Sequence, residues 1–138
     1  MDVAYVIAPF TGWFIAGSLK LVINYLQSGR LVWNQLGLGG LPSNHTAVVS
    51  STAVLIGLRE GVNTALFAIA VTLAIIVILD ALNLRREVGA HAAALNELLR
   101  GDAQRQPLRE HVGHRQVEVL TGFLVGLGCA LLLHAVFP

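Results

Sequence analysis

Two histidines of this chain stand where an apolar segment begins, and each is accompanied by polar residues. His45 closes the stretch Gly-Gly-Leu-Pro-Ser-Asn-His, and His114 lies in the cluster Gly-His-Arg-Gln-Val-Glu at 113–118. A neutral imidazole can attack phosphorus when a carboxylate keeps its other ring nitrogen protonated. His114 and Glu118 are four residues apart, so their side chains share a face of a helix. The two clusters together predict a phosphate-handling site at a membrane surface.

Hydrolysis of a phosphate ester also needs positive groups around the non-bridging oxygens. Arginine suits this task because its planar fork can bind two phosphate oxygens together. Arg85 and Arg86 follow the third apolar segment, and Lys20 lies inside the first. His45 stands at a helix start, where free backbone N–H groups attract anions. The groups required for phosphate ester hydrolysis are therefore all present.

The composition is that of a membrane protein. Of the 138 residues, 55% are hydrophobic and only 12% are charged, and the mean hydropathy is +0.70. A soluble domain carries about twice that charged fraction. The formal net charge of +1 gives no electrostatic case for binding nucleic acid. The single cysteine, Cys129, excludes an internal disulfide and a cysteine-rich metal site.

Four apolar segments could hold these residues in a bilayer, where a spanning helix needs about 20 apolar residues. They run over residues 3–26, 44–58, 62–82 and 117–137. The second is short and polar at its start, so it could span only a thinned region or enter as a broken helix. Residues 84–100 alternate apolar and charged positions at helical spacing, which predicts an amphipathic helix against the membrane or over the mouth of the bundle. We expect an all-α integral membrane bundle that forms one domain over residues 1–138.

The connections between these segments differ in charge. If the segments alternate in direction, the loops 27–43 and 83–116 lie on one face, and the turn 59–61 and both termini lie on the other. The first face carries seven arginines, whereas the second carries only Arg59. An excess of Lys and Arg in short loops marks the cytoplasmic side. This predicts a protein of the cell inner membrane whose histidine clusters face the cytoplasm and whose termini lie opposite.

The histidine clusters belong to three sequence blocks, at residues 39–45, 80–86 and 108–122. They read Gly-Gly-Leu-Pro-Ser-Asn-His, Asp-Ala-Leu-Asn-Leu-Arg-Arg and Leu-Arg-Glu-His-Val-Gly-His-Arg-Gln-Val-Glu-Val-Leu-Thr-Gly. In order and separation, these blocks resemble the divergent branch of the type 2 phosphatidic acid phosphatases. That branch is also called the acid phosphatase/vanadium-dependent haloperoxidase-related family. The resemblance extends from Lys20 to Gly126, which is nearly the whole chain.

The resemblance implies a catalytic role for three residues. His114 would form a phosphohistidine intermediate, and His45 would protonate the leaving group. Glu118 would orient His114, in place of the aspartate that the wider superfamily uses. No cofactor and no metal are implied.

The resemblance also implies how the phosphate is held. Lys20 would bind it, and Ser43 with the Asn44 amide would cradle it, although Asn44 stands where the superfamily has glycine. The superfamily's Ser-Arg pair does not precede His114 at the usual distance. The missing arginine could be supplied by Arg85, Arg86 or Arg109, of which we favour the first two.

Structural roles compete with these functions. The Pro-Ser-Asn sequence before His45 is also good chemistry for starting a helix. Lys20 could extend its ammonium from the first segment to the membrane surface. Arg85 and Arg86 could be anchors on the cytoplasmic side. Asp80 either contributes to the phosphate site or simply pairs with one of these arginines.

Three functions from different classes follow. The first is a membrane phosphatase acting on a lipid phosphomonoester, such as phosphatidylglycerophosphate or phosphatidate, or on a prenyl diphosphate. The second is a metal-dependent membrane hydrolase, although the spacing of its ligands matches no recognised set. Those ligands would be His45, Asp80, His111 and His114. The third is a non-catalytic membrane protein that binds lipid phosphates.

A second copy of the chain is a further expected partner. The parent superfamily encloses its site within a larger helical core, so a chain this short could complete its bundle as a homodimer. Gly122 and Gly126 lie four residues apart on one helix face, where small residues allow close packing. This face is the predicted dimer contact.

Overall fold

The protein is built from helices, and the part of the chain that the structure describes contains no strand. The computed structural model describes residues 3–29, 40–100, 106–110 and 112–137. The elements are α1 (Val3–Ser28), α2 (Asn44–Arg59), α3 (Ala65–Leu79), the π-helical turn η2 (Asp80–Leu84), α4 (Arg85–Leu98) and α5 (Gln116–Val136). The predicted all-α membrane fold is confirmed, and each predicted apolar segment corresponds to a helix.

Three helical stretches are long and apolar enough to cross a membrane: α1, the continuous helix Ala65–Leu98, and α5. The fourth apolar segment, α2, has 16 residues. At 1.5 Å per residue it is about 24 Å long, which is short for a hydrocarbon core of about 30 Å. It contacts α1, α3 and α5, and half of its residues are buried. α2 is therefore the central packing element of the bundle.

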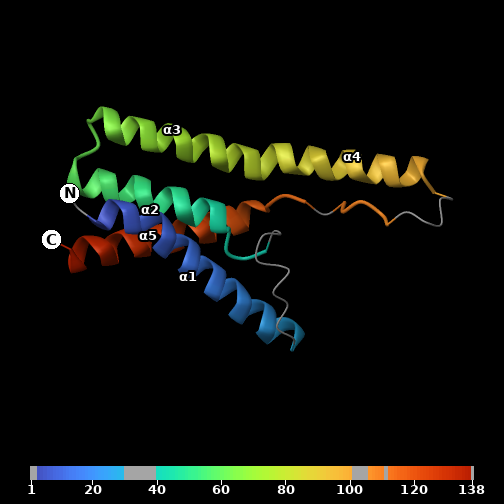
Figure 1. Ribbon diagram of the computed structural model, residues 1–138, viewed down its shortest axis with the longest axis horizontal. Coiled ribbons are helices and arrows are strands. Elements are labelled where there is room, and N and C mark those ends of the chain that lie inside the picture. Colours follow the sequence, from blue (N-terminus) through green and yellow to red (C-terminus); the bar gives the residue numbers. More distant parts are fainter. Residues whose placement is uncertain (1–2, 30–39, 101–105, 111, 138) are drawn as a thin grey trace.

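The helices are arranged so that two of them start at the same place. Figure 1 shows α2 and α5 side by side and running in the same direction, while α1 and α3 run the opposite way. α1 begins and α5 ends at one end of the bundle, marked by the N and C labels. The first turns of α2 and α5 consequently meet at the other end of the bundle. This is the end at which both histidines lie.

Glycines let these helices approach closely. A Cβ on Gly122 would lie 2.5 Å from the carbonyl oxygen of Ser43, and one on Gly12 would lie 2.7 Å from the carbonyl oxygen of Ala47. A Cβ on Gly126 would likewise overlap α2. The prediction that Gly122 and Gly126 form a dimer contact is therefore wrong. Their face is buried inside the chain, because α5 packs directly on α2.

The predicted amphipathic helix exists, but it does not lie over the bundle. η2 joins α3 to α4 without a break, which gives one helix of 34 residues, or about 51 Å. In Figure 1, α4 continues the line of α3 beyond the other helices. This length exceeds the hydrocarbon core by about 20 Å, so the continuous helix is longer than one crossing of a membrane requires.

A return segment runs back along α4 from residue 106 to α5. The Asn96 side chain holds it at Leu108, donating to the carbonyl oxygen at 2.7 Å and accepting from the N–H at 2.7 Å. Asn96 also donates to the Glu110 carboxylate at 2.9 Å. Gly89 has no side chain to obstruct the backbone of Glu110, which passes directly over it. The partners of Asn96 lie 12 and 14 residues farther along the chain, so no local sequence pattern predicts these contacts.

Candidate active site

The two histidines predicted to act together are neighbours. The ring centroids of His45 and His114 are 5.7 Å apart, and the rings meet edge to face at 85°. His45 lies in the first turn of α2, and His114 lies two residues before α5. A backbone hydrogen bond of 2.9 Å, from the Ser43 N–H to the Glu118 carbonyl oxygen, joins the two segments. Residues from distant parts of the sequence thus form one site.

Both helix starts at the site are suited to binding an anion. Ser43 caps α2, because its hydroxyl oxygen accepts hydrogen bonds from the Thr46 N–H at 3.3 Å and the Thr46 hydroxyl at 3.0 Å. α5 begins after Arg115 without a side-chain cap. The positive ends of two helix dipoles therefore converge next to the histidine pair. Ser43 is fully buried and Asn44 is nearly so. The hydrogen bonds of Ser43 show that it caps α2.

His114 is fixed by the π-helical turn η2. The Arg85 N–H bonds to the Asp80 carbonyl oxygen, five residues back, as a π turn requires. The Ala81 carbonyl oxygen then accepts the His114 N–H at 3.0 Å. Gly113 permits the sharp turn before His114, since its φ of 108° disfavours any side chain.

Cationic side chains surround the histidine pair. Lys20 is 1% exposed, so it does not extend to the membrane surface, and its charge acts on both Glu118 and His114. The Arg85 Nη2 atom lies 3.4 Å from His45 Nε2. The Arg85 Nε atom is 3.0 Å from the Asp80 carboxylate. Asp80 therefore positions Arg85. From the sequence, Asp80 could either contribute to the phosphate site or pair with an arginine, and the structure shows the pair.

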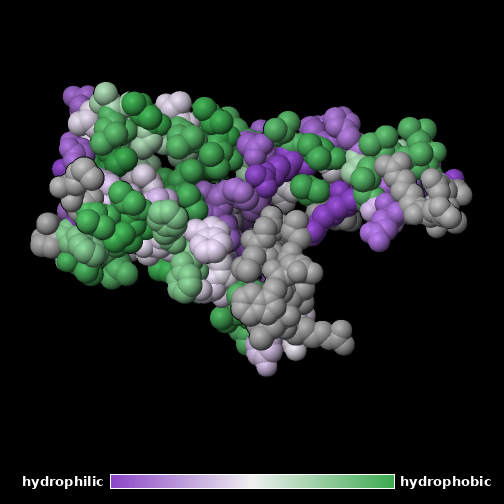
Figure 2. All heavy atoms as spheres, viewed as in Figure 1, coloured by the Kyte–Doolittle hydropathy of each residue, from purple (hydrophilic) through white to green (hydrophobic). Residues whose placement is uncertain are grey.

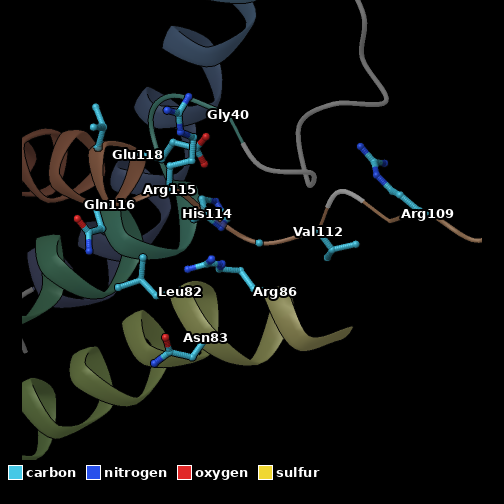
Figure 3. A pocket seen from close by; sticks show the side chains of 12 residues that line it. Gly40, Leu82, Asn83, Arg86, Arg109, Val112, His114, Arg115, Gln116 and Glu118 are labelled. Carbon is cyan, nitrogen blue, oxygen red and sulfur yellow. The ribbon is translucent and has the colours of Figure 1, made fainter. Parts of the chain in front are cut away.

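A cavity of about 760 Å³ opens beside His114. Figure 3 shows the Arg86 side chain extending toward His114, with Arg115 near Glu118 and Arg109 farther out along the return segment. The remaining lining comes from Gly40, Leu82, Asn83, Val112, Gly113, Gln116 and Val117. In Figure 2, hydrophilic surface gathers in this central region, between the apolar bundle and α4. The site therefore lies where the apolar part of the molecule ends.

The expected hydrogen bond between Glu118 and His114 is not formed. The His114 Nδ1 atom and the Glu118 Oε2 atom are both buried, and neither has a partner among the described residues. Glu118 instead contributes its backbone carbonyl to Ser43 and its charge to Lys20. For Glu118 to orient the His114 ring as predicted, the two side chains would have to move closer to each other.

The surroundings of His114 keep its imidazole neutral. Burial, followed by the charges of Lys20, His45 and Arg85, lowers the pKa of His114 from 6.5 to about 4. A neutral imidazole has a free electron pair, which a nucleophile needs.

The model of the divergent PAP2 family matches residues 1–129. The chain belongs to the divergent PAP2 family. The chain is also 30% identical over 132 residues to the uncharacterized membrane protein YuiD of Bacillus subtilis (strain 168), covering 83% of this chain and 84% of that protein. No solved structure matches it.

Membership of the divergent PAP2 family confirms the resemblance seen in the three sequence blocks, and α1, α3 and α5 support an integral membrane location. The structure brings the block residues to one end of the bundle. It adds Arg115, to which the sequence analysis gave no role and which directly follows His114. Arg109, one of the three candidates for the missing arginine, also lines the cavity. The adjacency of Arg115 to the histidine was the signal that could have identified it.

The metal-dependent alternative has no ligand set in the described part of this divergent PAP2 protein. No group of three His, Cys, Asp or Glu side chains converges there. His111, one of the four expected ligands, lies outside the described residues. Asp80, another of the four, is engaged by Arg85.

Proposed function

We propose that this protein is a membrane-embedded phosphatase that hydrolyses a lipid phosphate through a phosphohistidine at His114. The observation that carries the proposal is the His45–His114 pair, with ring centroids 5.7 Å apart at the starts of two parallel helices. A histidine pair of this kind can divide acid and nucleophile between its two rings. Membership of the divergent PAP2 family is consistent with this chemistry.

The reaction takes place in two steps. A lone pair of the neutral His114 ring attacks phosphorus, and the ester P–O bond breaks with its electrons on the leaving oxygen. That oxygen takes a proton from His45, which starts the reaction protonated. Burial and the Arg85 charge lower the pKa of His45, and the negative charge of the bound phosphate opposes this shift. Water then attacks the phosphohistidine and loses a proton to His45, while the P–N bond breaks and its electrons return to His114. Phosphate is released and both rings recover their starting protonation.

The cations stabilise the negative charge that develops on phosphorus. Lys20 and Arg85, which flank the two rings, bind the non-bridging oxygens, and Arg86 binds from the cavity side. The Asn44 amide and the N–H groups at the start of α2 complete the cradle, with Ser43 holding that helix start in shape.

The location of the site favours a substrate that is anchored in the membrane. The lipid tail stays in the bilayer while its phosphate reaches the polar end of the bundle. The arginine excess at this end supports a location of the site on the cytoplasmic side of the inner membrane. Phosphatidylglycerophosphate and phosphatidate fit this side better than a prenyl diphosphate presented outside. A homodimer, if formed, must use a surface other than the buried Gly122 face.

The test is an assay of purified protein against these three lipid phosphates. We expect His114→Ala and His45→Ala each to lose more than about a hundredfold in kcat, the scale of nucleophilic or general acid catalysis. His91→Ala is the matched control, because His91 is exposed on α4. Rapid quenching should trap acid-labile phosphate on the wild-type protein and none on His114→Ala. Full activity of His114→Ala would refute the proposal.

A non-catalytic lipid-phosphate binder is the second candidate, because His114 and Glu118 are not hydrogen-bonded to each other. In that case the wild-type protein would bind phosphatidate, and Lys20→Met would weaken the binding, without any phosphate release.

Vanadate and a chelator distinguish the histidine phosphatase from a metal hydrolase. Vanadate, which mimics the transferred phosphoryl group, would inhibit a histidine phosphatase that a chelator leaves active. Inhibition by the chelator alone would indicate a metal hydrolase.

A further inference from the structure

One exposed side of α4 carries a regular row of residues. Its members are spaced by four, three, four and three residues: Leu84, Val88, His91, Leu95 and Leu98. All five are exposed, and the exposed fractions of the four apolar side chains lie between 44% and 81%. Apolar residues that alternate between spacings of three and four form the strip along which one helix packs on another. We call this row the seam.

The seam continues into α3. Four exposed apolar residues of α3 follow the same spacing: Leu66, Ile69, Leu73 and Ile76. From Ile76 to Leu84 is eight residues, one more than the seven that two such steps require. The extra residue falls in η2 (Asp80–Leu84), where a π turn takes up one residue more than an α-helical turn. The two rows therefore form one line of about 50 Å along the continuous helix.

The other sides of α4 have different contacts. Gly89 and Asn96, which hold the return segment, lie about 120° around the helix from the seam. The ion pair between Glu97 and Arg100 lies on the far side of the helix. Neither the return segment nor this ion pair therefore covers the seam, which agrees with its exposure.

Lipid does not suit α4 as a cover for the seam. Four of the 14 residues of α4 are charged, and charged side chains are costly in hydrocarbon. An amphipathic helix can instead lie flat in the membrane surface. α4 cannot do so, because it continues the line of the apolar helix α3 (Figure 1). A second helix is the cover that matches both the spacing and the direction of the seam.

We propose that the seam packs on the same seam of a second copy of this chain. Both copies enter the membrane in the same direction, so the paired helices are parallel. In the heptad notation abcdefg, Val88 and Leu95 take position a, and Leu84, His91 and Leu98 take position d. Valine at a with leucine at d favours two strands in a parallel pair. His91 is the polar member, which fixes the register at a cost in stability.

The pairing is independent of the proposed phosphatase. His45 and His114 are not members of the seam, and both come from one chain. Loss of pairing and loss of phosphate release are therefore separate results.

Cysteine cross-linking in membranes tests the pairing. In the full chain with Cys129→Ala, Leu95→Cys places a thiol in the seam, and Glu97→Cys places one on the far side of the same helix. We expect copper phenanthroline to convert most of the Leu95→Cys protein, and little of the Glu97→Cys protein, into a disulfide-linked species of twice the 14.7 kDa chain mass. No dimer for Leu95→Cys, or as much dimer for Glu97→Cys, would overturn the proposal. If Leu95→Cys gave no dimer yet resisted a water-soluble maleimide, lipid would be the cover instead.

The strength of pairing provides a second test. Energy transfer between donor-labelled and acceptor-labelled copies is followed as phosphatidylglycerol and phosphatidylcholine vesicles dilute the protein. His91→Leu replaces the polar member of the seam by an apolar one, so half-dissociation should need at least about tenfold more lipid. Ala90→Leu, at an exposed position outside the seam, is the matched control and should behave as wild type. A His91→Leu protein that pairs no more strongly than Ala90→Leu would reject the seam as the contact.

Discussion

At the scale of single residues, the proposed phosphatase depends on the protonation state of His114. An ordinary histidine has a pKa of about 6.5 and is partly protonated at neutral pH. His114 has its pKa lowered to about 4, first by burial and then by Lys20, His45 and Arg85. The ring loses its nucleophilic lone pair only below that value. The acidic limb of kcat/KM should therefore lie near pH 4.

Lys20→Met tests this electrostatic coupling. Removing the Lys20 charge should raise the pKa of His114, so the acidic limb of kcat/KM should move upward from pH 4. It should stay below pH 6.5, because burial is the largest cause of the shift and remains. The position of the limb is the measurement, since the loss of a phosphate contact will also lower the overall rate. Lys20→Arg keeps the charge and should keep the limb in place. An unmoved limb in Lys20→Met contradicts the assignment.

Substitutions of Asp80 and of Arg85 should lower kcat/KM by very different amounts. Their side chains are about one third exposed, and such a pair contributes about 0.2–1 kcal/mol. Asp80→Asn should therefore lower kcat/KM only a few fold, through a less well-held Arg85. Arg85→Ala removes a charged hydrogen bond to phosphate and should cost about tenfold to a hundredfold. Equal and complete losses in both variants would instead make Asp80 a direct ligand.

At the scale of helices, η2 is the element that aligns the site. A regular α-helix would use the Ala81 carbonyl for its own Arg85 N–H. The π turn shifts that bond to Asp80, and the carbonyl accepts the backbone N–H of His114 instead. One extra residue in a helix thus ties Arg85 and Arg86 to the segment that carries His114. Turns of this kind recur at functional sites.

Deletion of Asn83 should remove this alignment. Shortening η2 by one residue restores a regular helix, which rotates Arg85 and Arg86 by about 100° relative to α3. We expect activity to be lost while the helix content measured by circular dichroism is unchanged. Asn83→Ala keeps the length of η2 and should stay active. A deletion variant with normal activity would show that η2 does not position the site.

The sequence was sufficient to predict the apolar helices and the proximity of the two histidine motifs. Apolar runs of spanning length define α1, α3 and α5, and motif chemistry placed His45 beside His114. It could not predict η2, because a π turn differs from an α turn by one hydrogen bond and has no residue signature. It could not predict the Asn96 contacts either, since they depend on the path of the return segment.

At the scale of the whole molecule, the bundle is held together by small residues rather than by large apolar side chains. The buried apolar residues are mostly alanines, and glycines of α1 and α5 pack against the backbone of α2. Large apolar side chains face outward, where lipid surrounds them. The position of the His45 and His114 segments consequently depends on the closeness of α2 and α5.

Gly122→Leu should therefore damage the fold and the site together. A Cβ at this position would lie 2.5 Å from the Ser43 carbonyl oxygen and 3.0 Å from Thr46, so α5 would have to move away from the start of α2. Overpacking of this kind costs about 1–3 kcal/mol, which should lower the melting temperature and the activity of the detergent-solubilised protein. Gly128→Leu is the control on the same helix, because nothing lies within 4 Å of its added Cβ. If Gly122→Leu changed only the oligomeric state and left the melting temperature unaltered, the glycine face would be a contact between chains instead of within one.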